Sequence, residues 1–97
     1  MREDLEALRG ATVAAVLRGP GELPSTLREA LARGEAPDEM RVLVEKVRDR
    51  PWEVTDADLD ALRASYTDDQ LFEVVMATVI GAAEVRFRAG IRALEGQ

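Results

Sequence analysis

The sequence predicts an all-α fold, a small orthogonal bundle of helices that ends in one long C-terminal helix. Three observations support this. Apolar residues recur every three or four positions, and no segment shows the strict apolar–polar alternation of a strand. Glycine and proline separate the periodic segments at Gly19-Pro20-Gly21, between Gly34 and Pro37, and at Pro51. With 97 residues, 46% of them hydrophobic and 33% charged, the chain has the size and composition of one small folded domain.

The first two expected helices flank the Gly-Pro-Gly break, which divides residues 1–22 from a helical core over residues 23–97. The first helix is expected over residues 3–17. Its apolar face carries Leu5, Leu8, Thr12 and Val16. The second is expected over residues 25–33, with Ser25 as its N-cap and Gly34 as the residue that ends it.

Two further short helices are expected before residue 65. Pro37 suits the first position of the third helix, because proline has no amide hydrogen to lose there and the acids after it suit the first turn. The buried stripe of this helix is Met40, Leu43, Val44 and Val47. Thr55 and Asp58 form a capping box that starts a helix reaching about residue 64. Leu59 and Leu62 are its expected core residues.

The longest helix is expected over residues 68–94, because Thr67 and Gln70 form a second capping box and Gly96 lies just past its end. One face carries Phe72, Met76, Ile80, Ala83, Phe87, Ile91 and Leu94. A second face carries Leu71, Val75, Val79, Ala82 and Arg86. A chain of this size has little protein to cover both faces. We therefore expect the second face to be a subunit interface; the alternative is that the short helices wrap around it.

Composition restricts the chemistry. Thirteen basic against nineteen acidic residues give a net charge of −6, which argues against nucleic acid as a partner. The chain has no cysteine and no histidine, so it lacks thiol chemistry, the commonest general base and the usual zinc ligands. We expect no metal and no cofactor. No targeting segment and no apolar run of membrane-spanning length is visible, so the expected location is cytoplasmic, without a membrane partner.

Few residues stand out as candidates for a site. The acidic run Asp56–Asp60 is similar to the start of a calcium-binding loop, but Ala61 stands where the turn glycine is needed and Thr67 where the closing glutamate is needed. Helix-start acids explain the run without a ligand. Trp52 and Tyr66 lie at joints between helices and are interpreted as core residues, each with one polar group.

Residues 44–94 resemble the helical core of the carboxymuconolactone decarboxylase and alkylhydroperoxidase D-like (AhpD-like) superfamily. The matching features are VTDADLDALRA, YTDDQLFEVV and the small-residue stretch around Ile80-Gly81-Ala82-Ala83, and the upstream LPSTLREALARGEAPDEM fits the lead-in of that group. The resemblance implies an all-helical fold that assembles into trimers, hexamers or related oligomers. It also implies a redox cysteine pair near Val47–Val54, where this chain has neither cysteine nor histidine.

The leading hypothesis is therefore a non-redox, cysteine-less AhpD-like module that works as a homo-oligomer in a structural, binding or accessory role. It is not expected to be a thiol peroxidase, and no catalytic residue is assigned. One alternative is a small decarboxylase-like enzyme whose inter-subunit pocket uses carboxylates with Trp52, Tyr66 and Arg86. Arg86 would there bind an anion or an acid of a neighbouring subunit. Another alternative is an adaptor that binds a different protein through an open helix groove.

Overall fold

The computed structural model describes residues 2–96, and the all-α prediction is confirmed: helices and no strands occur in that range. The α-helices are α1 (Arg2–Arg18), α2 (Ser25–Ala32), α3 (Arg41–Asp49), α4 (Asp56–Arg63) and α5 (Asp68–Glu95). Two single-turn 3₁₀ helices, η1 (Asp38–Met40) and η2 (Pro51–Glu53), precede α3 and α4. None of the helices within residues 2–96 combines the length and the apolar character that a membrane crossing requires.

Both predicted capping boxes are present. The Thr55 amide donates to the Asp58 carboxylate at 2.9 Å, and the Asp58 amide donates back to the Thr55 hydroxyl at 3.4 Å. The Thr67 amide donates to the Gln70 side chain at 2.9 Å, and the Gln70 amide donates to the Thr67 hydroxyl at 3.1 Å. These reciprocal bonds satisfy amides that a helix start leaves without partners, and they fix where α4 and α5 begin.

The predicted end of α2 is also confirmed, because Gly34 follows it with a φ of 81°, a conformation that favours glycine. One predicted N-cap is wrong by one residue, and one predicted helix start is wrong by four. Pro24, not Ser25, is the N-cap of α2, and Ser25 is its first helical residue. Pro37 caps η1, whereas α3 itself begins at Arg41. Proline fixes an extended entry in both places, with a φ near −55° and a ψ near 145°.

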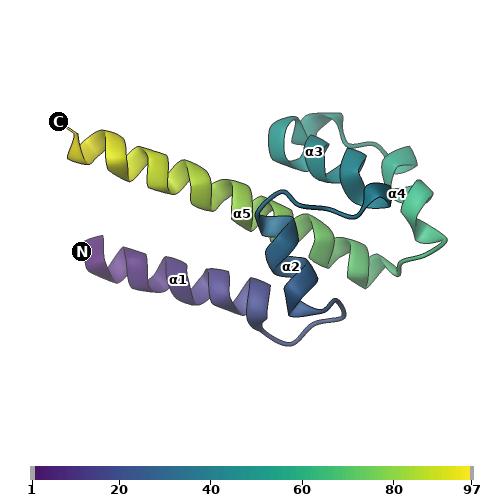
Figure 1. Ribbon diagram of the computed structural model, residues 1–97, viewed down its shortest axis with the longest axis horizontal. Coiled ribbons are helices and arrows are strands. Elements are labelled where there is room, and N and C mark those ends of the chain that lie inside the picture. Colours follow the sequence, from purple (N-terminus) through teal and green to yellow (C-terminus); the bar gives the residue numbers. More distant parts are fainter. Residues whose placement is uncertain (1, 97) are drawn as a thin grey trace.

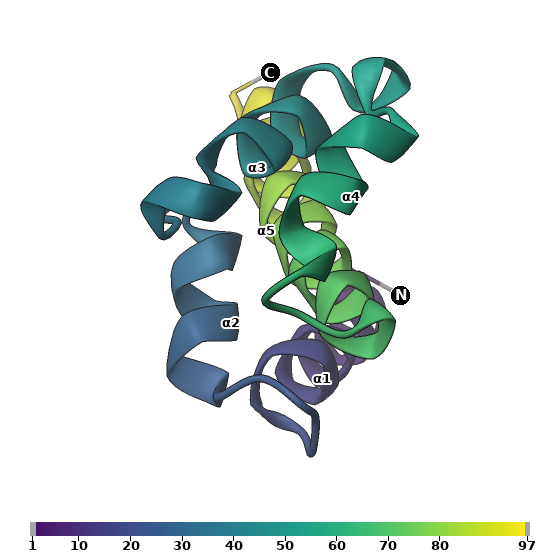
Figure 2. The same cartoon turned by 90° about the vertical axis from the view of Figure 1, so that its right-hand side faces the viewer.

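The long helix α5 is the axis of the molecule (Figure 1). Helix α2 packs against its middle, and α3 and α4 pack against its first half from another side (Figures 1 and 2). Helix α1 runs antiparallel to α5, so both chain ends lie at the same end of the molecule (Figure 1). The C-terminal half of α5 and the N-terminal half of α1 extend past the other helices.

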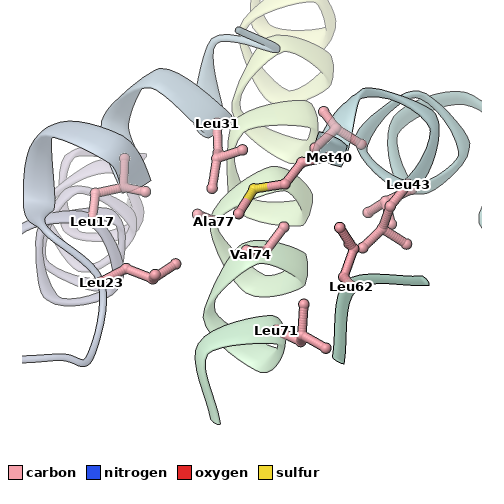
Figure 3. Packing of buried hydrophobic residues seen from close by; sticks show 11 residues of the cluster. Leu17, Leu23, Leu31, Met40, Leu43, Leu62, Leu71, Val74 and Ala77 are labelled. Carbon is pink, nitrogen blue, oxygen red and sulfur yellow. The ribbon is translucent and has the colours of Figure 1, made fainter. Parts of the chain in front are cut away.

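The core lies where α5 meets α2, α3 and α4. Leu31 of α2 and Met40 of η1 point at α5 near Val74 and Ala77, and all four side chains are fully buried (Figure 3). The predicted stripe of the third helix is confirmed in full. Its members Met40, Leu43, Val44 and Val47 are all buried. Burying such side chains contributes about 1.5–3 kcal/mol each, so this contact dominates the stability of the fold.

The closest approach in the core is between α5 and the end of α2. A Cβ atom at Gly81 would overlap the backbone carbonyl of Ala32. Only glycine allows the two backbones to come this near, and the contact sets the position of α2 along α5.

The inward side of α1 is only partly the predicted one. Val16 of the predicted face is half-buried against the core, whereas Leu5 and Leu8 are exposed. Leu17 is buried and Val13 half-buried against the core, although neither was predicted to lie on the inward face. Arg9 forms an ion pair with Glu84 of α5. The molecule is elongated, measuring 48 × 28 × 18 Å, and leaves apolar side chains of α1 in solvent.

Candidate functional site

The predicted interface face of α5 is largely covered by the chain itself. Leu71 and Ala82 are buried, with 4% and 7% of their surfaces exposed, and Val75 is half-buried against the core. Helices α3 and α4 pack against this side of α5. The prediction that Leu71 and Ala82 lie on an open face of α5 is therefore wrong, because both are buried within the chain. The short helices do wrap around this face, as the alternative interpretation had it.

A different face of α5 is left open. It carries residues spaced alternately three and four apart, the repeat that places side chains on one stripe of a helix that packs on another helix. We call this stripe the α5 seam; it consists of Asp69, Phe72, Met76, Val79, Ala83 and Arg86. Phe72 is 66% exposed and Val79 is 41% exposed, and of the six residues only Met76 is half-buried.

Of the five predicted interface residues, Val79 and Arg86 are thus exposed and belong to the seam. The sequence predicted an uncovered apolar face on α5, but three of the five expected residues, Leu71, Val75 and Ala82, lie on the covered side.

An apolar hollow of about 420 Å³ lies beside the seam, between α1 and α5. It is lined by Leu5, Leu8, Arg9, Thr12, Val13, Ile80, Ala83, Glu84 and Phe87. The guanidinium of Arg9 stands 4.8 Å from the centre of the Phe87 ring, where a cation–π contact adds to its ion pair with Glu84. These contacts hold the two walls of the hollow together, and Ala83 in its lining is exposed.

A second hollow lies where the turn after α1 meets the first half of α5. Its wall includes Arg28, which is buried with 5% of its surface exposed. The Arg28 guanidinium donates to the Val16 carbonyl at 2.9 Å, and its Nε lies 3.9 Å from a carboxylate oxygen of Glu73. That carboxylate also accepts the amides of Glu22 at 2.7 Å and Leu23 at 3.2 Å.

The Arg28–Glu73 pair therefore ties the Gly-Pro-Gly turn, α2 and α5 together. This pair could not be predicted from the sequence, because a single arginine on a short helix has the pattern of a solvent-exposed residue.

Trp52, Tyr66 and Arg86 were proposed as pocket residues in one alternative, but neither hollow beside α5 includes any of them. Trp52 is 78% exposed on η2, so its interpretation as a core residue is wrong. Proline at position 51 begins a 3₁₀ turn that directs the indole to solvent. Arg86 donates to the backbone carbonyl of Arg48 at 2.9 Å.

Tyr66 is half-buried, and its hydroxyl donates to Glu39 at 2.7 Å, as expected for a core tyrosine with one polar contact. This hydrogen bond lowers the pKa of Glu39. The same bond, together with burial, raises the pKa of Tyr66. Neither shift brings a group toward neutral pH, so the pair has no acid or base poised for catalysis.

One more ion pair joins two helices. Lys46 of α3 contacts both carboxylate oxygens of Asp58 at 2.9 and 3.0 Å. The hydrogen bond from Lys46, with the Thr55 amide as a second donor, lowers the pKa of Asp58. Asp58 thus caps α4 and anchors it to α3. Among the described residues no group of three or more acidic side chains gathers as a metal site would require.

Comparison with known proteins adds no relative. No family model matches the sequence, and neither the curated proteins nor the solved structures contain a significant match. The AhpD-like resemblance therefore rests on its sequence motifs alone.

Proposed function

We propose that this chain is a non-redox helical module that works as a homo-oligomer, with the α5 seam as its principal contact. The observation that carries the proposal is the exposure of Phe72 and Val79 on the half of α5 against which α2, α3 and α4 pack. A soluble monomer gains nothing from placing a large aromatic side chain in water on its longest helix. Contiguous exposed apolar surface of this kind is typical of protein contacts.

The shape of the molecule supports the same proposal. Its radius of gyration is 14.7 Å. A compact domain of this length has a radius of about 13 Å. The excess comes from the outer halves of α1 and α5, which extend past the other helices (Figure 1). Association of copies through the seam would raise the share of buried surface, which is small for chains of this size.

The AhpD-like resemblance agrees with an oligomer and with a structural, binding or accessory role. Its redox activity is not part of the proposal, because a thiolate is required and the chain has no cysteine. The decarboxylase-like alternative has no observation in its favour, since its residues Trp52, Tyr66 and Arg86 do not share a hollow beside α5.

The test is the mass of the protein in solution, measured by light scattering coupled to size exclusion. We expect a multiple of the 10.7 kDa chain mass. The variant Val79→Glu places a carboxylate at the centre of the seam and buries it without a partner, which costs several kcal/mol. We therefore expect this variant to dissociate.

The matched control is Val85→Glu. Val85 is an exposed valine of the same helix that lies off the seam, on the side that carries α2. This variant should keep the wild-type mass. A wild-type mass of one chain would contradict the proposal and favour an adaptor for another protein. Equal dissociation by both variants would show that the seam is not the contact.

A further inference from the structure

The α5 seam is complementary to a second copy of itself when the two run antiparallel. Its six residues form three pairs, each equidistant from a point between Ala77 and Thr78. Asp69 is matched with Arg86, Phe72 with Ala83, and Met76 with Val79. Two copies related by a two-fold axis at that point would bring both members of each pair face to face, since a two-fold contact uses the same patch twice.

We propose that two chains dock through the α5 seam in this antiparallel register, so that Asp69 of each chain forms an ion pair with Arg86 of the partner. This inference rests on the proposed function and identifies the partner at the seam as a second copy. It goes further by fixing the direction, the register and the symmetry of the contact.

The charges at the ends of the seam support the register. Asp69 is exposed and has no hydrogen bond or ion pair among the described residues. Arg86 is exposed as well and donates only to a backbone carbonyl, so its charge has no carboxylate partner in that part of the chain. A parallel pairing would place like charges together at each end, which is unfavourable. The antiparallel pairing neutralises four charges in one dimer.

The shapes along the seam support it too. Phe72 is the largest exposed side chain of the seam, and Ala83 is the smallest residue in it. Ala83 lies in the wall of the apolar hollow between α1 and α5, next to Ile80 and Phe87. The register directs the partner's Phe72 into this hollow, as a knob enters a hole in paired helices. The symmetry axis repeats the contact, so both exposed phenylalanines and both hollows are filled.

The centre of the seam completes the contact. Met76 meets the partner's Val79 on both sides of the axis. Both residues are apolar, and the flexible methionine side chain can adapt to the compact valine. The seam from Asp69 to Arg86 is about 25 Å long at 1.5 Å per residue. Apolar residues at its centre and charges at its rim match the usual organisation of protein interfaces.

The pairing is tested by exchanging the charges at Asp69 and Arg86. The dissociation constant of the dimer is measured for each variant by sedimentation. Arg86→Asp places two carboxylates opposite each other at both ends, and we expect about tenfold weaker association. Asp69→Arg is expected to do the same. The double variant Asp69→Arg/Arg86→Asp restores opposite charges, and we expect an affinity within about threefold of the wild type. Arg92→Asp is the control, because Arg92 is an exposed arginine of α5 outside the seam.

Direction is tested by cross-linking in the naturally cysteine-free chain. Asp69→Cys and Arg86→Cys variants are mixed and treated with a short bis-maleimide. The register predicts that the mixture forms a cross-linked dimer, whereas each variant alone does not, because identical positions lie about 25 Å apart along the helices.

The outcomes separate this inference from the proposed function. A wild-type oligomer with no rescue by the double variant, or with cross-links within each single variant, would overturn the antiparallel register and leave oligomer formation standing. An isolated trimer would also overturn it, because a trimer has no two-fold axis. A monomeric wild type would overturn both.

Discussion

Replacing Glu73 with alanine should destabilise the fold more than replacement of an exposed acidic residue. The carboxylate accepts the amides of Glu22 and Leu23 and lies 3.9 Å from the buried Arg28 guanidinium. Removing one partner of a buried ion pair costs about 3–5 kcal/mol. The lower end applies here, because 19% of the Glu73 side chain is exposed and Arg28 keeps its backbone carbonyl partners. We expect a loss of about 3 kcal/mol.

That loss corresponds to a fall in melting temperature of roughly 12–24 °C, since 1 kcal/mol moves the midpoint of a domain this small by about 4–8 °C. Circular dichroism at 222 nm during heating measures it, at one fixed protein concentration because association also stabilises the fold. The control is Glu45→Ala, an exposed acid of α3, for which a change within about 0.5 kcal/mol is expected. A Glu73→Ala melting point equal to that of the control would refute the role given to the Arg28–Glu73 pair.

Two other predictions concern packing and pH. Gly81→Ala should lower the stability by about 1–3 kcal/mol in urea unfolding, because the new methyl group meets the Ala32 carbonyl. Gly10→Ala, where space is open, should raise it by up to about 1 kcal/mol; equal effects would contradict the close contact. The lowered pKa of Asp58 means that its bond to Lys46 stabilises the fold above the unfolded-state pKa and is lost as the pH falls through the folded-state pKa. Asp58→Asn should therefore melt below the wild type at pH 7, and the difference should shrink as the pH falls below the unfolded-state pKa of about 4 and vanish below the lowered folded-state pKa; a constant difference would contradict this assignment.

The sequence predicted the helix boundaries well where local chemistry decides them. Thr55 and Thr67 start helices because each has an acceptor or donor three residues later that completes the box. Gly34 ends α2 because glycine adopts the positive φ at low cost. The N-cap of α2 is Pro24 and not Ser25, and α3 begins four residues after Pro37, because proline can be the last extended residue or the first helical one.

The sequence could not decide which sides of the helices are covered. Both faces of α5 are apolar, so periodicity alone gives no reason to prefer the side of Leu71 over the side of Phe72. The choice depends on where α3 and α4 pack, which is a property of the tertiary structure. The inward positions of Leu17 and Val13 were missed for the same reason, because they depend on how α1 packs against α2 and α5.

The charged contacts between distant segments were also beyond sequence reasoning. Arg28 and Glu73 lie 45 positions apart, and nothing in the spacing links them. Lys46 and Asp58 are in different helices, although the capping role of Asp58 was visible from its distance to Thr55. Such pairs are found only when the packing of the helices is known.

The most direct test of the central claim is the mass of the wild-type protein by sedimentation equilibrium at low micromolar concentration. Exposure of Phe72 and Val79 on the α5 seam predicts an assembly of at least two chains, and a two-fold seam predicts an even number of them. A mass that stays at 10.7 kDa across the concentration range would contradict the claim that copies of this chain cover the α5 seam.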